Sequence, residues 1–321
     1  MTEGNQEPVR PEPISQPEGL LPQKTSVFVG ESGLRAGWRF LIYLAIVVAG
    51  GALVNVLVRL VLRPQRNAAI TGWVLLWQEA LGFALVFGAA LIMSRIERRS
   101  PGAYGLPAGE MFGTKFWLGF TLGLAEISVL IGLISAFGGY SFGTLALHGS
   151  EIVKSGLLYL VAFTLVGLFE EFAFRGYSLY TLGDGIGFWP AALLLSLAFG
   201  GAHLGNPGEG WVGAASVVAI ALLFCFSLKR SGSLWYAVGL HASFDWGETY
   251  LYSVPNSGAV MQGHLSDAIL HAGPKWLTGG TVGPEGSVFC FLTIALQFLA
   301  VLWLFPANVP NVAGVDVMPT D

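Results

Sequence analysis

The sequence predicts an all-α integral membrane protein, a polytopic bundle of about eight transmembrane helices. Composition carries the first argument: 54% of the 321 residues are hydrophobic, 11% are charged, and the mean hydropathy is +0.64. Soluble globular proteins carry about 25% charged residues, so this chain has too few charges to coat a water-exposed surface. A bilayer removes that requirement, because lipid tails solvate apolar faces and each backbone amide bonds inside its own helix.

The second observation is a series of apolar runs of membrane-spanning length. A helix needs about 20 apolar residues to cross a hydrocarbon core about 30 Å thick. The predicted spans are residues 38–62, 73–96, 116–137, 156–182, 188–204, 211–228, 234–252 and 288–305. The fifth is shorter and ends at the helix-breaking sequence Gly-Asn-Pro-Gly, residues 205–208. In the third, Gly119 and Gly123 have the GxxxG spacing that favours close helix packing.

We expect five segments along the chain: a disordered cytoplasmic tail, a first group of transmembrane helices, a transmembrane core, a loop, and a last helix with its tail. They cover residues 1–34, 35–140, 150–255, 256–286 and 287–321. The stretch from Met1 to Thr25 is rich in Pro, Glu and Gln and lacks a basic region before an apolar core, which is typical of a disordered tail and not of a signal peptide. Three ionisable residues of the loop are spaced loosely, and we interpret them as solvated side chains and not as a metal site: His264, Asp267 and His271.

Lysine and arginine residues predict the orientation in the membrane. With a cytoplasmic N-terminus, ten of the 16 basic residues lie on the cytoplasmic side and five on the opposite side, while Arg175 lies inside a span. The positive-inside rule therefore places both termini in the cytoplasm, and we expect the plasma membrane. The net charge of −4 argues for no nucleic-acid partner.

Ionisable residues inside the spans are the candidates for chemistry. Each costs about 2.5–3.5 kcal/mol at the centre of a bilayer, so each needs a partner or a function. They gather in three motifs on three predicted spans, which are Glu170-Glu171-Phe172-Ala173-Phe174-Arg175, Phe199-Gly200-Gly201-Ala202-His203 and His241-Ala242-Ser243-Phe244-Asp245. A single intramembrane Glu or His is as often a packing hydrogen-bond partner as a functional group. Three such motifs together favour function.

Helical geometry indicates what each motif can do. Glu171 and Arg175 are four residues apart and share a face, so the arginine can neutralise that carboxylate. Glu170 points about 100° away and lacks a local cation, which makes it a candidate proton acceptor. His241 and Asp245 are also four apart, so the carboxylate can fix the tautomer of the imidazole.

These residues can activate water in two ways, and the sequence leaves both open. Glutamate and histidine can act directly as general bases. Alternatively, a divalent metal such as zinc can be held by the candidate ligands Glu170, His203 and His241. Other polar residues of the spans have no local cation, and we interpret them as bundle-facing hydrogen-bond partners: Gln78, Glu79 and Glu126.

The three motifs resemble those of the CPBP family, the CAAX-protease and bacteriocin-processing (Abi-type) group, which includes the type II CAAX prenyl endopeptidases. That family's pattern is Glu-Glu-x-x-x-Arg, then Phe-x-x-x-His, then His-x-x-x-Asn or Asp, on separate transmembrane helices. Here the motifs stand in that order, and the resemblance covers about residues 156–252.

The resemblance implies an intramembrane endopeptidase that cuts near the C-terminus of a prenylated or otherwise membrane-associated peptide. It implies that Glu170 and His203 activate the attacking water, and that His241 and Asp245 stabilise the oxyanion. Because an ionised aspartate cannot donate a hydrogen bond, we expect Asp245 to orient His241 instead. The family is described both as metalloproteases and as metal-free glutamate peptidases.

Two other classes of function compete with the peptidase. A proton-coupled transporter would use the glutamates and histidines as a relay, and it predicts matched inverted halves that this sequence does not display. A non-catalytic membrane scaffold or immunity-type protein would keep the fold for binding. The intact motifs favour the peptidase.

Overall fold

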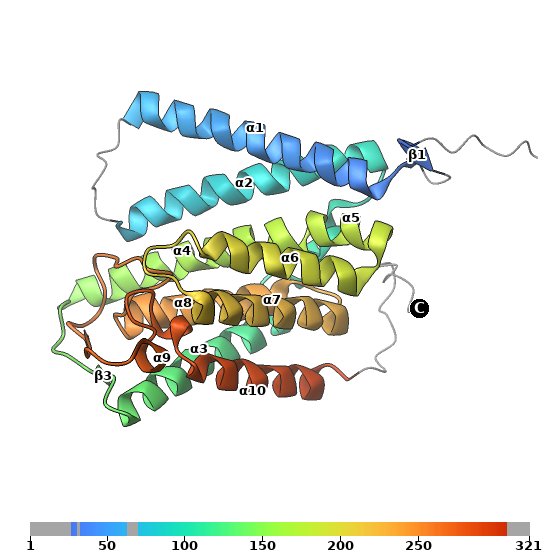
Figure 1. Cartoon of the computed structure of the whole chain (residues 1–321). Helices are drawn as coiled ribbons and strands as arrows, with labels where there is room; N and C mark the ends of the chain where they lie inside the picture. The colour runs from blue at the N-terminus through green and yellow to red at the C-terminus, as the bar shows by residue number, and fades with distance from the viewer. Residues whose placement is uncertain (1–26, 31–32, 63–69, 307–321) are drawn as a thin grey trace, which may run out of the picture. The chain divides into compact units, whose positions relative to one another are not determined.

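The structure is a computed structural model that describes residues 27–30, 33–62 and 70–306. Most of the predicted N-terminal tail, and the tail after residue 306, lie outside these residues. The chain divides into two units at Arg35. The first unit contains a short antiparallel pair, β1 (Val29–Gly30) and β2 (Gly33–Leu34). The second unit, from Ala36 onwards, contains the helices that the structure describes (Figure 1).

The second unit is an all-α bundle, as the sequence predicts. Its helices are α1 (Ala36–Leu62), α2 (Gly72–Glu97), α3 (Thr114–Ala136), α4 (Ser150–Arg175), α5 (Tyr177–Ile186), α6 (Phe188–His203), α7 (Trp211–Ser231), α8 (Trp235–Trp246), α9 (Lys275–Thr278) and α10 (Phe289–Leu304). Short turns of 3-10 helix are η1 (Pro101–Tyr104), η2 (Ala108–Glu110) and η4 (Pro284–Gly286), and η3 (Gly247–Leu251) is a π-helical turn. One antiparallel pair joins β3 (Tyr140–Ser141) to β4 (Ile269–Leu270).

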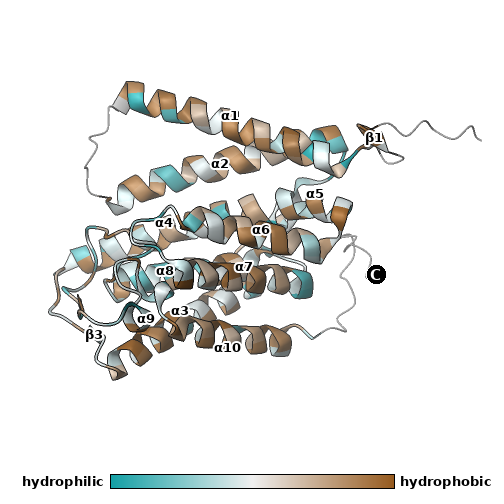
Figure 2. Ribbon diagram, in the orientation of Figure 1, coloured by the Kyte–Doolittle hydropathy of each residue, from teal (hydrophilic) through white to brown (hydrophobic). Residues whose placement is uncertain are grey.

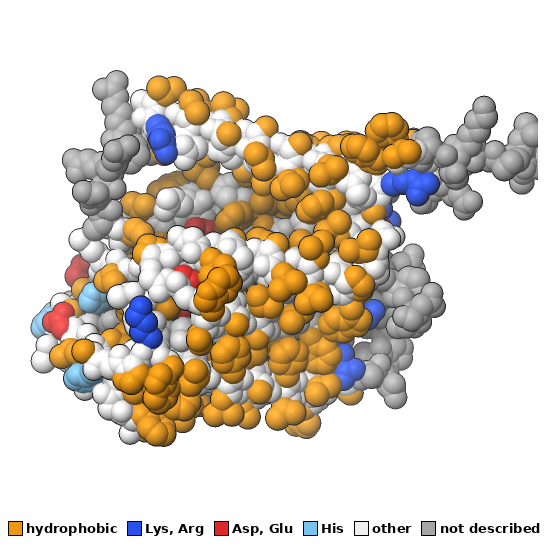
Figure 3. Space-filling view, viewed as in Figure 1, with side chains coloured by type: hydrophobic (Ala, Val, Ile, Leu, Met, Phe, Trp, Pro, Cys, Tyr) orange, Lys and Arg blue, Asp and Glu red, His pale blue; other side chains and the backbone are white. Residues whose placement is uncertain are grey.

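Five stretches of helix are long and apolar enough to cross a membrane: 36–61, 72–97, 114–136, 150–186 and 211–231. The other predicted spans are helical but shorter, since α6 and α10 have 16 residues each and α8 has 12 before it continues into η3. Large apolar side chains lie on the outer faces, where Trp303 is 81% and Leu60 67% exposed. Brown, apolar helices in Figure 2 and the orange face in Figure 3 show the same pattern. The chain is an integral membrane protein, while the count of eight spans and the orientation stay predictions.

The fourth predicted span is not one continuous helix. We expected a single helix over 156–182, but α4 ends at Arg175 and α5 begins at Tyr177. Gly176, between them, has a ψ of −122°, and a Cβ there would overlap the carbonyl oxygen of Phe172. The bend therefore requires glycine at this position, and it follows directly after the Glu-Glu-x-x-x-Arg motif.

Close packing fixes α8 against α3. A Cβ on either Gly119 or Gly123 of α3 would overlap a backbone carbonyl oxygen of α8, and a Cβ on Gly239 of α8 would overlap the carbonyl oxygen of Phe116. The predicted role of the GxxxG spacing in helix packing is confirmed. Helix α4 packs against both α2 and α8, and α6 packs against α7. The three helices that carry the motifs, α4, α6 and α8, therefore converge within one bundle.

Candidate active site

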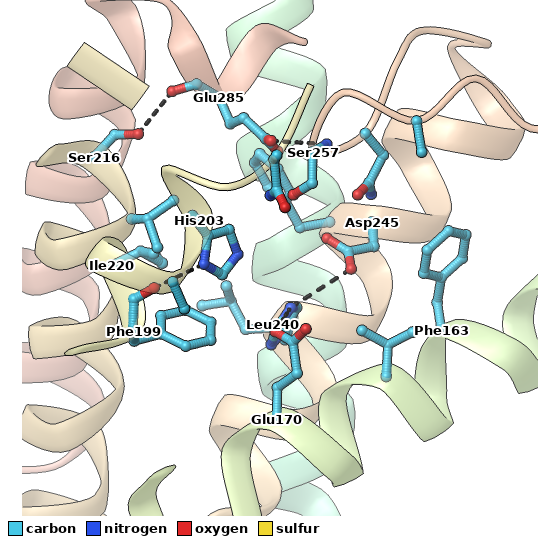
Figure 4. Close-up of a pocket in the computed structure, with 18 of the residues that line it drawn as sticks. Phe163, Glu170, Phe199, His203, Ser216, Ile220, Leu240, Asp245, Ser257 and Glu285 are labelled. Atoms are coloured by element: carbon cyan, nitrogen blue, oxygen red, sulfur yellow. Dashed lines mark hydrogen bonds and ion pairs between the residues drawn. The ribbon is translucent and has the colours of Figure 1, made fainter. Parts of the chain in front are cut away.

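The three motifs meet at a cavity of about 400 Å³ inside the bundle. Glu170 from α4, His203 from α6, and His241 and Asp245 from α8 all line it. Figure 4 shows Glu170, His203, Asp245 and Glu285 entering a common space from different elements. The remaining two predicted site residues, Glu171 and Arg175, do not line the cavity, because both side chains are completely buried behind it.

Glu171 is the residue that positions the imidazole of His241. Nδ1 of His241 lies 2.9 Å from Oε1 of Glu171, which is a hydrogen bond. Nε2 lies 3.5 Å from Oδ2 of Asp245 and 3.7 Å from Oε2 of Glu170, both beyond ordinary hydrogen-bond length. The predicted His241–Asp245 pair is present as an ion-pair contact, while the role of Asp245 in fixing the tautomer stays a prediction. The i,i+4 spacing brings Asp245 near the ring, but the shorter bond is made across helices by Glu171.

Arg175 lies between the motifs. Its Nη1 is 3.3 Å from Oε1 of Glu171, which confirms the predicted pair. The guanidinium carbon lies 4.5 Å from the ring centre of Phe199 and 5.6 Å from that of Phe224, and Phe224 in turn stacks on His241 with ring centres 5.6 Å apart. Cation–π contact explains why an aromatic residue precedes His203 by one turn.

His203 presents one free nitrogen to the cavity. Its Nδ1 lies 2.8 Å from the carbonyl oxygen of Phe199. Because a carbonyl only accepts hydrogen bonds, Nδ1 carries the proton in this bond. The neutral tautomer then directs the lone pair of Nε2 toward the cavity, where it can accept a proton or orient a water molecule.

Sequence reasoning missed several residues of the cavity wall. Gln78, Glu79 and Glu126 line the cavity, which agrees with the prediction that they face the interior of the bundle and places them beside the candidate site. Glu126 combines both roles, since its Oε1 accepts a 3.2 Å hydrogen bond from Thr293 on α10 while its Oε2 has no partner among the described residues. A lone acid in a span carries no signal of the helix face it occupies, which is why the sequence did not identify them.

The segment 252–288, between η3 and α10, supplies further wall residues, including Asn256 and Glu285. Nothing in the spacing of this segment pointed to them. Its histidines, in contrast, behave as predicted for loop residues: His264 bonds the carbonyl oxygen of Ser266, and His271 bonds the hydroxyl of Ser141.

The candidate metal ligands do not form a ready-made metal site. Within the part of the chain that the structure describes, no three side chains of His, Cys, Asp or Glu are arranged to hold a metal ion. Of the three candidates, Glu170 and His241 approach each other, at 3.7 Å.

The raised pKa of Glu285 predicts that the stability of the folded protein depends on pH. Burial, and then the neighbouring Asp245 carboxyl, raises its pKa to about 8 from 4.5. The folded state therefore binds a proton that the unfolded chain releases in this range, so the contribution to stability is complete below about pH 4.5 and is lost as pH rises through 8. We expect Glu285→Gln to flatten the fall in thermal stability between about pH 5 and pH 8.

The glutamine is a close control because its side-chain oxygen can still accept the 2.8 Å hydrogen bond from the Ser257 backbone N–H. The measurement is thermal unfolding in detergent across that pH range. If the melting temperatures of wild type and variant fall in parallel as pH rises, Glu285 is not the group that binds the proton.

A comparison with protein families identifies the region that carries the motifs. The family model described as type II CAAX prenyl endopeptidase Rce1-like matches residues 152–247. The chain matches no curated protein and no solved structure. The match contains α4 to α8, and hence all three motifs around the cavity. Over residues 152–247 this integral membrane protein is therefore similar to the Rce1-like family of type II CAAX prenyl endopeptidases.

Proposed function

We propose that this chain is an intramembrane endopeptidase that hydrolyses a peptide bond in a membrane-associated substrate. One observation carries the proposal: four side chains able to move protons or bind an oxyanion line a single cavity inside an apolar bundle. They are Glu170, His203, His241 and Asp245. The Rce1-like match over the same helices supports a CAAX-protease-like reaction.

In this proposal Glu170 is the general base. Its side chain is 27% exposed, and its nearest ionisable partner is Nε2 of His241 at 3.7 Å, so its oxygens are free to bind water. Glu170 takes a proton from a water molecule that Nε2 of His203 orients, and the water oxygen bonds to the substrate carbonyl carbon. The carbonyl π electrons move to oxygen; when the oxyanion collapses, the C–N bond breaks and Glu170 returns the proton to the leaving nitrogen.

His241 is proposed as an oxyanion donor. Glu171 holds Nδ1 at 2.9 Å, so the ring plane is fixed before substrate arrives. In the protonated ring, the Nε2–H group is then available to the developing negative charge, and a fixed donor costs no reorganisation during the reaction. Asp245, at 3.5 Å from Nε2, contributes a stabilising negative charge beside the imidazolium.

The cavity wall indicates the substrate class. Between the ionisable groups it is apolar, with aromatic and aliphatic side chains such as Phe163, Val166, Val217, Ile220 and Ile294. Such a surface favours an apolar peptide segment, or one joined to a lipid, over a soluble polar peptide. We propose a membrane-anchored peptide or protein terminus as substrate, with prenylation as one form of the anchor.

The test is cleavage of a library of membrane-anchored fluorogenic peptides by purified protein in nanodiscs, with and without a chelator. We expect wild type to cleave at least one anchored peptide and to leave the same peptides without an anchor largely intact. Activity that survives chelation supports the side-chain mechanism. If the chelator abolishes activity and added zinc restores it, a metal-dependent mechanism replaces the side-chain mechanism. The absence of cleavage across the library would overturn the peptidase and favour a non-catalytic scaffold.

A further inference from the structure

The oxyanion of peptide hydrolysis needs more donors than the predicted motifs supply. A tetrahedral oxyanion is stabilised by preorganised hydrogen-bond donors at about 2.7–3.1 Å. Ionised carboxylates only accept hydrogen bonds, so Glu170 and Asp245 of the motifs cannot serve. His203 directs a lone pair into the cavity, as derived above. Among the motif residues, His241 alone remains as a donor.

The side-chain amide of Asn256 can supply the additional hydrogen-bond donor. Its side chain lines the cavity, is 8% exposed, and adjoins the Asp245 carboxyl. Its Nδ2 lies near the Asp245 carboxyl but makes no hydrogen bond of ordinary length to a described residue, so at least one of its two N–H groups is available to a ligand. A buried amide N–H without a partner is uncommon in folded proteins and calls for an explanation. A bound substrate oxygen would satisfy it.

The backbone around Asn256 is held rigidly, independently of the side chain. Asn256 and Ala259 exchange two backbone hydrogen bonds of 3.0 and 2.8 Å across a turn whose central residues, Ser257 and Gly258, have φ of 48° and 78°. These positive values at both central positions are those of a type I′ turn. Glycine is required at 258, since a Cβ there would overlap the carbonyl oxygen of Pro207.

Two further contacts connect this turn to Val282 and to Glu285 of η4. The Ser257 N–H donates a 2.8 Å hydrogen bond to Oε1 of Glu285, and the Gly258 N–H donates one of 2.8 Å to the carbonyl oxygen of Val282. Glu285 is in turn anchored on α7, because the hydroxyl of Ser216 donates a 2.7 Å hydrogen bond to its backbone oxygen. The backbone that carries the Asn256 side chain is therefore fixed before substrate binds, which favours an effective oxyanion donor.

We propose that Asn256 is a catalytic residue whose Nδ2–H donates a hydrogen bond to the substrate carbonyl oxygen, and most strongly to the oxyanion, beside His241. This inference rests on the proposed peptidase function. It places part of the catalytic site outside the family match, which ends at residue 247.

The test compares Asn256→Ala and Asn256→Asp with wild type on a cleaved anchored peptide. We expect kcat to fall about 100- to 1000-fold in both variants, the usual effect of losing one oxyanion donor, with KM nearly unchanged. Both variants keep the four hydrogen bonds of the turn, so Asn256→Ala should unfold near the wild-type temperature, whereas Asn256→Asp, which adds a carboxyl beside Asp245, should unfold earlier. Asn55→Ala, the same kind of change at an exposed position of α1, is the matched control and should retain full activity.

Inhibitor binding provides a second measurement that does not need turnover. A phosphinic peptide mimics the anionic tetrahedral intermediate, whereas an uncleavable peptide of the same sequence mimics the ground state. We expect both Asn256 variants to bind the phosphinic peptide at least about 100-fold more weakly and the uncleavable peptide almost unchanged. Equal losses for the two ligands, or wild-type kcat in both variants, would overturn the role of Asn256.

These outcomes separate the two proposals. If wild type cleaves and Glu170→Ala does not, while the Asn256 variants remain fully active, the peptidase stands and the Asn256 assignment fails. If wild type cleaves nothing and binds no phosphinic peptide, the proposed function fails and this inference fails with it.

Discussion

Glu170→Ala is expected to lower kcat by about 1000-fold or more, within the range for removal of a general base, with little change in substrate binding. Glu170 is the carboxylate of the Glu-Glu-x-x-x-Arg motif that faces the cavity, while Glu171 is buried and engaged by Arg175 and His241. The measurement is steady-state cleavage of the anchored peptide, with protein integrity checked by gel filtration and thermal unfolding.

Two comparisons make this prediction specific. Glu151→Ala, on the same helix but 61% exposed at its side chain, should keep full activity. Glu79→Ala tests a rival base, because Glu79 lines the same cavity from α2 and its carboxyl interacts with that of Glu170. Loss of activity in Glu79→Ala with retention in Glu170→Ala would transfer the role of the base to α2.

The sequence predicted the all-α membrane class and the convergence of the three motifs because both depend on strong local signals. Apolar runs of span length report helices directly, and ionisable residues in such runs are too costly to face lipid. The same signals could not show the bend at Gly176. That bend depends on the close approach of the Phe172 carbonyl oxygen, and glycines are common in transmembrane helices without breaking them.

Partners on different helices were the weaker part of the prediction. Helical spacing brings Asp245 near His241, and this correctly placed both in the site, but it could not reveal Glu171, which reaches His241 from α4. Asn256 and Glu285 had no signal at all, because they lie in a segment whose course is set by a turn and backbone contacts and not by periodicity. Periodicity gives neighbours along one helix, whereas the site is completed by tertiary packing.

The second large effect is expected from Arg175→Ala, which should lower the free energy of unfolding by about 3–5 kcal/mol. Arg175 and Glu171 are both completely buried, with Nη1 and Oε1 3.3 Å apart. Removing the guanidinium leaves the Glu171 carboxylate buried without its cation, and also removes the surface on which Phe199 and Phe224 pack. Arg175→Lys should recover little of this loss, because an ammonium group cannot stack flat between two rings.

A double variant distinguishes charge from packing. In Glu171→Gln/Arg175→Met the buried charges are gone, the side-chain volumes are nearly kept, and the glutamine oxygen can still accept from Nδ1 of His241. Replacing a buried ion pair with neutral groups is often neutral or stabilising, so the double variant should unfold at a higher temperature than Arg175→Ala. If Arg175→Ala is as stable as wild type in detergent, the pair contributes nothing to the fold. Among the described residues, His241 is the only histidine whose two ring nitrogens both face carboxylates. A double variant that is stable yet cleaves more slowly would therefore show that the Glu171–Arg175 pair serves catalysis by holding His241.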